Sequence, residues 1–90
     1  MTHIEEIFLA AKKIYLDDKK HEFTRNDITN MLGFTTQEWD IGYTGDFQGM
    51  INGVPPLKNK IRPKYRDVFV RVKPTIYTFS EKGISLLNIE

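Results

Sequence analysis

Apolar residues in the first part of the chain recur three or four positions apart, which is the spacing of one face of an α-helix. This pattern predicts a helix from about Ile4 to Leu16. Thr2 and Glu5 fit a capping box at its start, in which each side chain satisfies a backbone N–H of the other residue. The polar run of residues 17–22 then indicates a solvated connector rather than an acid/base site.

A second helix is predicted from about Arg25 to Leu32. Thr24 is placed to cap its start, and Gly33 stands where a left-handed residue commonly ends a helix. Thr35 to Glu38 forms another capping box, so a third helix should follow at once. Two helices joined by a tight glycine-containing turn make a helix-turn-helix.

The third predicted helix carries an apolar stripe from Trp39 to Ile51 but is rich in glycine. The glycines inside it are Gly42, Gly45 and Gly49. Each costs roughly 1 kcal/mol relative to alanine in a helix interior. The pattern leaves two alternatives, a continuous helix or a break near Tyr43 with a restart capped by Thr44. The helical spacing of Trp39, Tyr43 and Phe47 favours the core over a stacking platform for single-stranded nucleic acid.

From Asp67 onward the apolar period changes to two, which is the period of a β-strand. A strand pair is predicted from Val68 to Phe79, with Lys73-Pro74-Thr75 as its turn. The valines that share one face of the first strand are Val68, Val70 and Val72. A short helix should begin near Ser80 and pack its apolar side chains inward: Ile84, Leu87 and Leu86. We expect residues 1–90 to form one α+β domain.

Three stretches of this pattern resemble winged-helix (winged helix-turn-helix) domains. They are Phe23-Thr24-Arg25-Asn26-Asp27-Ile28 with Gly33 beyond it, Phe69-Val70-Arg71-Val72-Lys73, and the strand from Ile76 that leads into Ser80, Gly83 and Leu86-Leu87. The chain is also similar to small bacterial winged modules that accompany restriction and HNH-type nucleases, and to transcription regulators. The resemblance implies three N-terminal helices, a β-hairpin wing and a short C-terminal helix. It further implies DNA binding, with the third helix in the major groove and the hairpin against the backbone or minor groove.

Positive charge is concentrated just before and inside the predicted hairpin. Residues 54–73 hold seven Lys or Arg and one Asp, whereas residues 1–53 hold five Lys or Arg and nine Asp or Glu. Because the whole chain has a net charge of only +1, its charges are segregated. Such a cluster attracts phosphate or an acidic protein surface. We expect phosphate contacts from five cations of the preceding loop and two of the hairpin: Lys58, Lys60, Arg62, Lys64, Arg66, Arg71 and Lys73.

Contacts to base edges would have to come from neutral polar residues of the third helix. The candidates, whose amides and hydroxyl can pair in the major groove, are Thr44, Gln48 and Asn52. Gly45 and Gly49 would let the helix backbone approach DNA, or alternatively let another element of the same fold pack against it. Three acids on this helix oppose binding to phosphate: Glu38, Asp40 and Asp46. The cationic run also has an alternative, a solvated loop.

Several functions are disfavoured by what the sequence lacks. The chain has no cysteine, which excludes disulfides, thiol catalysis and thiolate metal sites. His3 and His21 have no companion at metal-ligand spacing, so we expect neither a metal nor a cofactor. No nucleophile is paired with a general base, so we expect no enzyme activity. No apolar run reaches the roughly 18–20 residues of a membrane span, and we expect a cytoplasmic protein without membrane contact.

The sequence predicts a module for double-stranded DNA, of bacterial or phage origin, that serves as a regulator or as the targeting domain of a DNA-processing system. The alternative is a protein-interaction or homodimerisation domain of the same fold, because fold alone does not decide function. Surface charge should separate the two. Cations on the face of Gln48 and Asn52 favour DNA, whereas cations turned away from it, with an exposed apolar patch, favour a partner protein.

Overall fold

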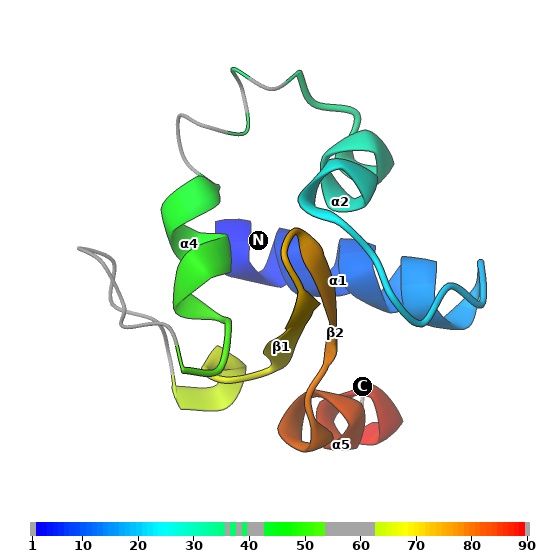
Figure 1. Cartoon of the computed structure of the whole chain (residues 1–90), viewed down its shortest axis with the longest axis vertical. Coiled ribbons are helices and arrows are strands. Elements are labelled where there is room, and N and C mark those ends of the chain that lie inside the picture. Colours follow the sequence, from blue (N-terminus) through cyan, green and yellow to red (C-terminus); the bar gives the residue numbers. More distant parts are fainter. Residues whose placement is uncertain (1, 36, 38, 40–42, 54–62, 90) are drawn as a thin grey trace.

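Helices surround a β-hairpin in this α+β fold, as the hydrophobic pattern predicts. The computed structural model describes residues 2–35, 37, 39, 43–53 and 63–89. The elements are α1 (His3–Leu16), α2 (Arg25–Leu32), α4 (Thr44–Gly49), the 3₁₀ turn η1 (Pro63–Tyr65), β1 (Phe69–Lys73), β2 (Ile76–Phe79) and α5 (Glu81–Ile89). Figure 1 shows the hairpin crossing α1, with α4 on one side of it, α2 on the other and α5 beyond its base.

Both predicted caps of the first two helices are confirmed. At α1 the hydroxyl of Thr2 accepts from the backbone N–H of Glu5 (3.2 Å), and the Glu5 carboxylate accepts from the N–H of Thr2 (3.3 Å). At α2 the hydroxyl of Thr24 accepts from the N–H of Asp27 (3.1 Å), and the Asp27 carboxylate accepts in return from the N–H of Thr24 (2.8 Å). Gly33 ends α2 in the left-handed conformation, with φ of 76°.

The core is built mainly from aromatic rings of segments that lie far apart in the sequence. Phe23, Phe69 and Phe79 contact one another pairwise, with ring centroids 5.2–5.8 Å apart. The apolar stripe of α1 packs against them through Phe8, whose ring lies edge-on to Phe79 at 5.8 Å. Burying a phenylalanine side chain contributes roughly 1.5–3 kcal/mol, so this cluster supplies much of the stabilisation available to 90 residues.

The hairpin pairs its strands in antiparallel register and carries one bulge. Phe69 lies opposite Phe79 at the base, whereas further out the pairing skips Val72. Val72 is 43% exposed, so the valine face predicted for this strand opens to solvent towards the tip. The predicted turn is one residue too long, because Lys73 still pairs with Ile76 as the last residue of β1.

Both edges of the hairpin are attached to the helical part of the fold. Phe23, just before α2, and Tyr77 of β2 exchange backbone hydrogen bonds of 2.8 Å in both directions. On the other edge, Phe69 of β1 donates to the carbonyl of Met50 (3.1 Å) and accepts from the N–H of Asn52 (2.7 Å). The hairpin is therefore held between the start of α2 and the end of α4.

The glycine-rich segment contains the short helix α4 (Thr44–Gly49). α4 begins at Thr44, and its N-cap is Tyr43, so the prediction that Thr44 would cap it is wrong by one position. The reason is that the Tyr43 carbonyl already accepts the N–H of Phe47 (2.9 Å). Residues 40–42 lie outside the described residues, so a continuous third helix and a break near Tyr43 both stay as alternatives.

The start of α5 is fitted closely to the start of β1. The hydroxyl of Ser80 accepts from the N–H of Gly83 (3.2 Å), and the N–H of Ser80 donates to the carbonyl of Val68 (2.9 Å). A Cβ at Gly83 would collide with that same carbonyl oxygen. The Ser80 and Gly83 pair thus has a physical cause, a cap and a close backbone approach.

The inward face of α5 differs in part from the prediction. Leu87 is buried and Leu86 is half-buried, as expected. Ile84 is 40% exposed, so its predicted inward position is wrong. The buried face runs instead through Gly83 and Leu87, which are one helical turn apart.

Candidate nucleic-acid interface

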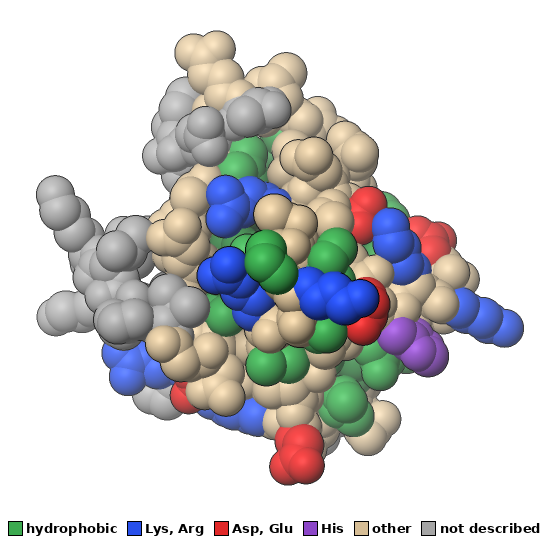
Figure 2. Space-filling view, in the orientation of Figure 1, with side chains coloured by type: hydrophobic (Ala, Val, Ile, Leu, Met, Phe, Trp, Pro, Cys, Tyr) green, Lys and Arg blue, Asp and Glu red, His purple; other side chains and the backbone are tan. Residues whose placement is uncertain are grey.

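The two hairpin cations lie on the outer half of β1. Arg71 and Lys73 are both exposed, opposite Tyr77 and Ile76 of β2 respectively. Residues directly opposite each other in an antiparallel pair project from the same face, so Arg71 and Tyr77 are neighbours there. Figure 2 shows Lys and Arg side chains gathered over the hairpin, with apolar side chains among them.

The segment before the hairpin adds further positive charge. Lys64 of η1 and Arg66 just after it are both exposed. The ammonium group of Lys64 lies 5.3 Å from the ring centroid of Tyr65, which is itself buried and so fixes this segment to the core. The remaining predicted phosphate contacts lie outside the described residues and stay predictions: Lys58, Lys60 and Arg62.

Within the described part of the chain, no acid forms a salt bridge with Arg66, Arg71 or Lys73. The salt bridges found there lie in the first turns of α2 and α4. Exposed cations without ion-pair partners produce a local positive potential, which extends about 8 Å at physiological ionic strength. This edge of the molecule is therefore attractive to polyanions.

The predicted base-reading residues lie on α4 or just after it. Thr44 and Gln48 are one turn apart and share a face, but both are half-buried. Asn52 is exposed, and its backbone hydrogen bond to Phe69 sets it beside the base of the hairpin. Gly49 is buried, which fits the alternative that glycine makes room for packing inside the fold. Of the three candidates, Asn52 is thus the most open to a ligand.

One acid of the predicted third helix, Asp46, lies close to a histidine of α1. An oxygen of Asp46 lies 3.7 Å from Nδ1 of His3, whose ring stacks on Tyr43 with centroids 4.1 Å apart. The hydroxyl of Tyr43 also donates to Glu6 (2.9 Å). These contacts join the start of α4 to the first turns of α1 and give His3 a packing role. The other two acids lie outside the described residues: Glu38 and Asp40.

Arg25 is a candidate that the sequence reasoning missed. It lines a hollow of about 390 Å³ between the start of α2 and the hairpin, together with Thr24, Asn26, Thr75 and Tyr77. Its guanidinium carbon lies 5.9 Å from the ring centroid of Phe47. In the sequence Arg25 falls in the acidic half, and only the long-range pairing of Phe23 with Tyr77 brings it to the hairpin.

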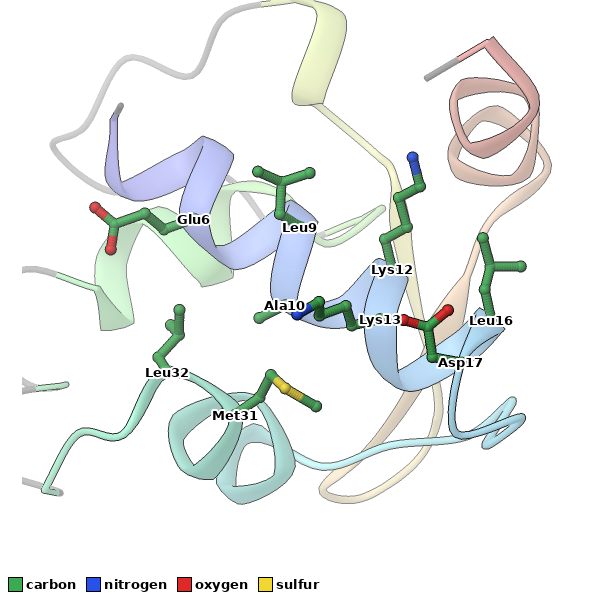
Figure 3. A pocket seen from close by; sticks show the side chains of 9 residues that line it. All are labelled: Glu6, Leu9, Ala10, Lys12, Lys13, Leu16, Asp17, Met31 and Leu32. Carbon is green, nitrogen blue, oxygen red and sulfur yellow. The ribbon is translucent and has the colours of Figure 1, made fainter.

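A surface of different character lies between α1 and α2. It is an open groove of about 490 Å³ whose apolar lining consists of Leu9, Ala10, Leu16, Met31 and Leu32. Its rim carries two acids and two bases: Glu6, Asp17, Lys12 and Lys13. Figure 3 shows the lining side chains of α1 in sequence along the helix, with Met31 and Leu32 reaching them from α2. Leu9, Leu16 and Met31 are 38–46% exposed, so the molecule also offers an apolar patch.

The described residues give little support to other kinds of site. Trp39 is 2% exposed and Phe47 is buried, so both belong to the core as predicted. No group of three or more metal-ligating His, Asp or Glu side chains occurs among the described residues. Within those residues, no helix has the length and apolar character needed to cross a bilayer.

In comparisons with known proteins, no family model, curated protein or solved structure matches the chain.

Proposed function

We propose that the chain is a winged-helix module that binds double-stranded DNA, as a regulator or as the targeting domain of a DNA-processing system in the cytoplasm. The order of its elements supports this proposal. Phe23, between α1 and α2, pairs with β2 as a short third strand would, and the β1–β2 hairpin then corresponds to the wing. α5 follows the hairpin as the closing helix.

The observation that carries the proposal is the set of exposed cations without ion-pair partners on and beside the hairpin. Within the described residues these are Arg66, Arg71 and Lys73. DNA presents closely spaced phosphates, and cations that neutralise them gain free energy by releasing condensed counterions. Such contacts position a protein without reading sequence. Asn52, exposed beside the hairpin base, is the best placed side chain for a base edge.

A fluorescence-anisotropy titration of labelled duplexes at several salt concentrations tests the proposal. The logarithm of the affinity should fall linearly with the logarithm of salt, by about 0.9 for each phosphate neutralised. Replacing Arg71 and Lys73 together by glutamine should flatten that slope by roughly 1.8 and weaken binding to all duplexes alike. The matched control replaces Lys12 and Lys13, which lie beside the α1–α2 groove, and should leave the slope unchanged. No binding to any duplex at roughly 50 mM salt, where electrostatic attraction is strongest, would overturn the proposal.

A protein-interaction or homodimerisation role is the second candidate, and the apolar groove between α1 and α2 favours it. Leu9, Leu16 and Met31 expose apolar area in one place, which a partner's apolar side chains could cover. Sedimentation velocity over a range of concentrations distinguishes the two roles. Self-association that Leu16→Glu abolishes, in a chain without affinity for duplexes, would favour this second function.

A further inference from the structure

We infer that Arg25 and the hollow beside it bind a phosphate group of the DNA backbone, an inference that rests on the proposed function and adds α2 to the interface. The hollow measures about 390 Å³ and is lined by Thr24, Arg25, Asn26, Thr75 and Tyr77. Each of these side chains can form a hydrogen bond, none is acidic, and one is a cation. That composition suits an anion with several oxygen atoms.

The guanidinium group of Arg25 lies over an aromatic ring and has unused hydrogen-bonding capacity. It lies over the ring of Phe47 at 5.9 Å, and the ring of Tyr77 meets the same phenylalanine edge-on at 5.0 Å. Nε of Arg25 is buried and has no hydrogen-bond partner within the described structure. Buried polar groups are normally paired, so Nε would gain a partner if an acceptor entered the hollow and the guanidinium group turned to meet it.

The acid nearest to Arg25 in the sequence does not neutralise this site. Asp27, two residues after Arg25, accepts hydrogen bonds from the backbone of Thr24 (2.8 Å) and from the ammonium group of Lys20 (2.9 Å). With Lys20 it lines a different hollow, and Arg25 forms no salt bridge within the described residues. The charge on the guanidinium therefore remains available.

A second cation stands close to the hollow. Arg71 lies opposite Tyr77 and shares its face of the hairpin. The paired backbone hydrogen bonds between Phe23 and Tyr77, each 2.8 Å, fix the start of α2 to this strand. The backbone segments that carry the two arginines are thus fixed relative to each other, which suits a ligand that presents phosphates at regular intervals. Arginine also donates two parallel hydrogen bonds to a phosphate, which lysine cannot do.

The test compares Arg25→Gln, Arg25→Lys and the control Lys13→Gln in duplex titrations at roughly 50 mM salt. Arg25→Gln should weaken binding by about tenfold and flatten the salt slope by about one unit. Arg25→Lys should restore the slope but only part of the affinity, because the charge returns without the planar fork. Lys13 lines the α1–α2 groove, so Lys13→Gln should have the same duplex affinity and salt slope as the unaltered chain.

A measurement on the unaltered chain covers the case in which Arg25→Gln does not fold. In a ¹H–¹⁵N spectrum, the Nε–H signal of Arg25 should shift on titration with duplex and move less with inorganic phosphate at the same phosphate concentration. If the chain binds duplexes but this signal stays unchanged, or Arg25→Gln binds as tightly as the original, the inference is overturned while the proposed function stands. An acidic peptide that shifts the signal more than duplex does would also overturn it. Failure of the original chain to bind any duplex would instead count against the proposed function itself.

Discussion

The two ends of the hairpin belong to one antiparallel strand pair but have opposite chemistry. At the base, Phe69 and Phe79 face each other with 0% and 3% exposure and ring centroids 5.2 Å apart. At the tip, Val72, Lys73 and Thr75 are all exposed. The difference lies in the side chains and in their neighbours, because only the base is covered by helices. The base should therefore determine stability, while the tip is free to carry charge.

Backbone contacts strengthen this contrast. Phe69 exchanges hydrogen bonds with Met50 and Asn52 on its free edge, in addition to its pairing with β2. The tip is closed only by Pro74 and Thr75. Substitutions at the two ends should consequently separate effects on folding from effects on binding.

The largest expected effect is that of Phe69→Ala. Truncating a fully buried phenylalanine costs about 3–5 kcal/mol, a large part of the stability of a small domain. Urea unfolding followed by circular dichroism should show the loss as a lower midpoint. The control, Val72→Ala on the same strand, should change the free energy of unfolding by less than about 0.5 kcal/mol, because Val72 is 43% exposed. Similar losses in the two variants would refute the division between base and tip.

An intermediate effect is expected for Asp27→Ala, at the helix start beside the tip. Partial burial raises the pKa of Asp27, but hydrogen bonds and charge from Lys20 and hydrogen bonds from Thr24 outweigh it and leave the pKa below its ordinary value. The folded state thus favours the charged carboxylate. Its contribution is fully present above the unfolded pKa of about 3.9 and is lost as the pH falls through the lower folded value.

Asp27→Ala should accordingly cost about 1 kcal/mol at neutral pH, similar to the loss of a side-chain hydrogen bond at the start of a helix. Unfolding in urea at neutral pH and again below about pH 3.5 should show the difference from the original chain shrinking on acidification. Asp18→Ala, in the exposed connector, is the control and should have a small effect at both pH values. A penalty for Asp27→Ala that is constant with pH would show that lost packing, and not the carboxylate charge, is responsible.

Local features of the fold could be predicted from the sequence because their partners are three or four residues apart. Thr2 with Glu5 forms the predicted capping box, and Thr24 is the predicted cap of α2, where the structure adds a capping box with Asp27. The predicted inward position of Ile84 is wrong because the orientation of α5 depends on its contact with the start of β1. That contact joins residues far apart in the sequence. The cap of α4 was misplaced by one residue in a segment where glycines weaken the helical signal.

The positive charge of the candidate site could be predicted from the sequence. The way in which distant segments come together to form the site could not. Arg71 and Lys73 stand out in the sequence because they end a run of cations, and the structure exposes both. Arg25 has no such signal, since its place beside the hairpin depends on the pairing of Phe23 with Tyr77 more than fifty residues away. Charge clusters are visible in a sequence, whereas a hollow formed by two distant segments is not.

The smallest expected effect, and the sharpest test of how little the tip contributes, is that of Thr75→Gly. Thr75 has φ of 69°, a left-handed conformation that strains a β-branched residue. Glycine relieves this strain but loses more entropy on folding, so a net gain of roughly 0.5 kcal/mol is expected. The control is Thr78→Gly, inside β2, where the hydroxyl donates to the carbonyl of His21 (2.6 Å) and no positive φ occurs. That variant should lose about 1 kcal/mol or more, because it removes both the hydrogen bond and strand propensity. Urea midpoints that move in opposite directions would establish that the turn is strained and the strand is not, whereas a loss in both would mean that Thr75 makes contacts that outweigh its backbone strain.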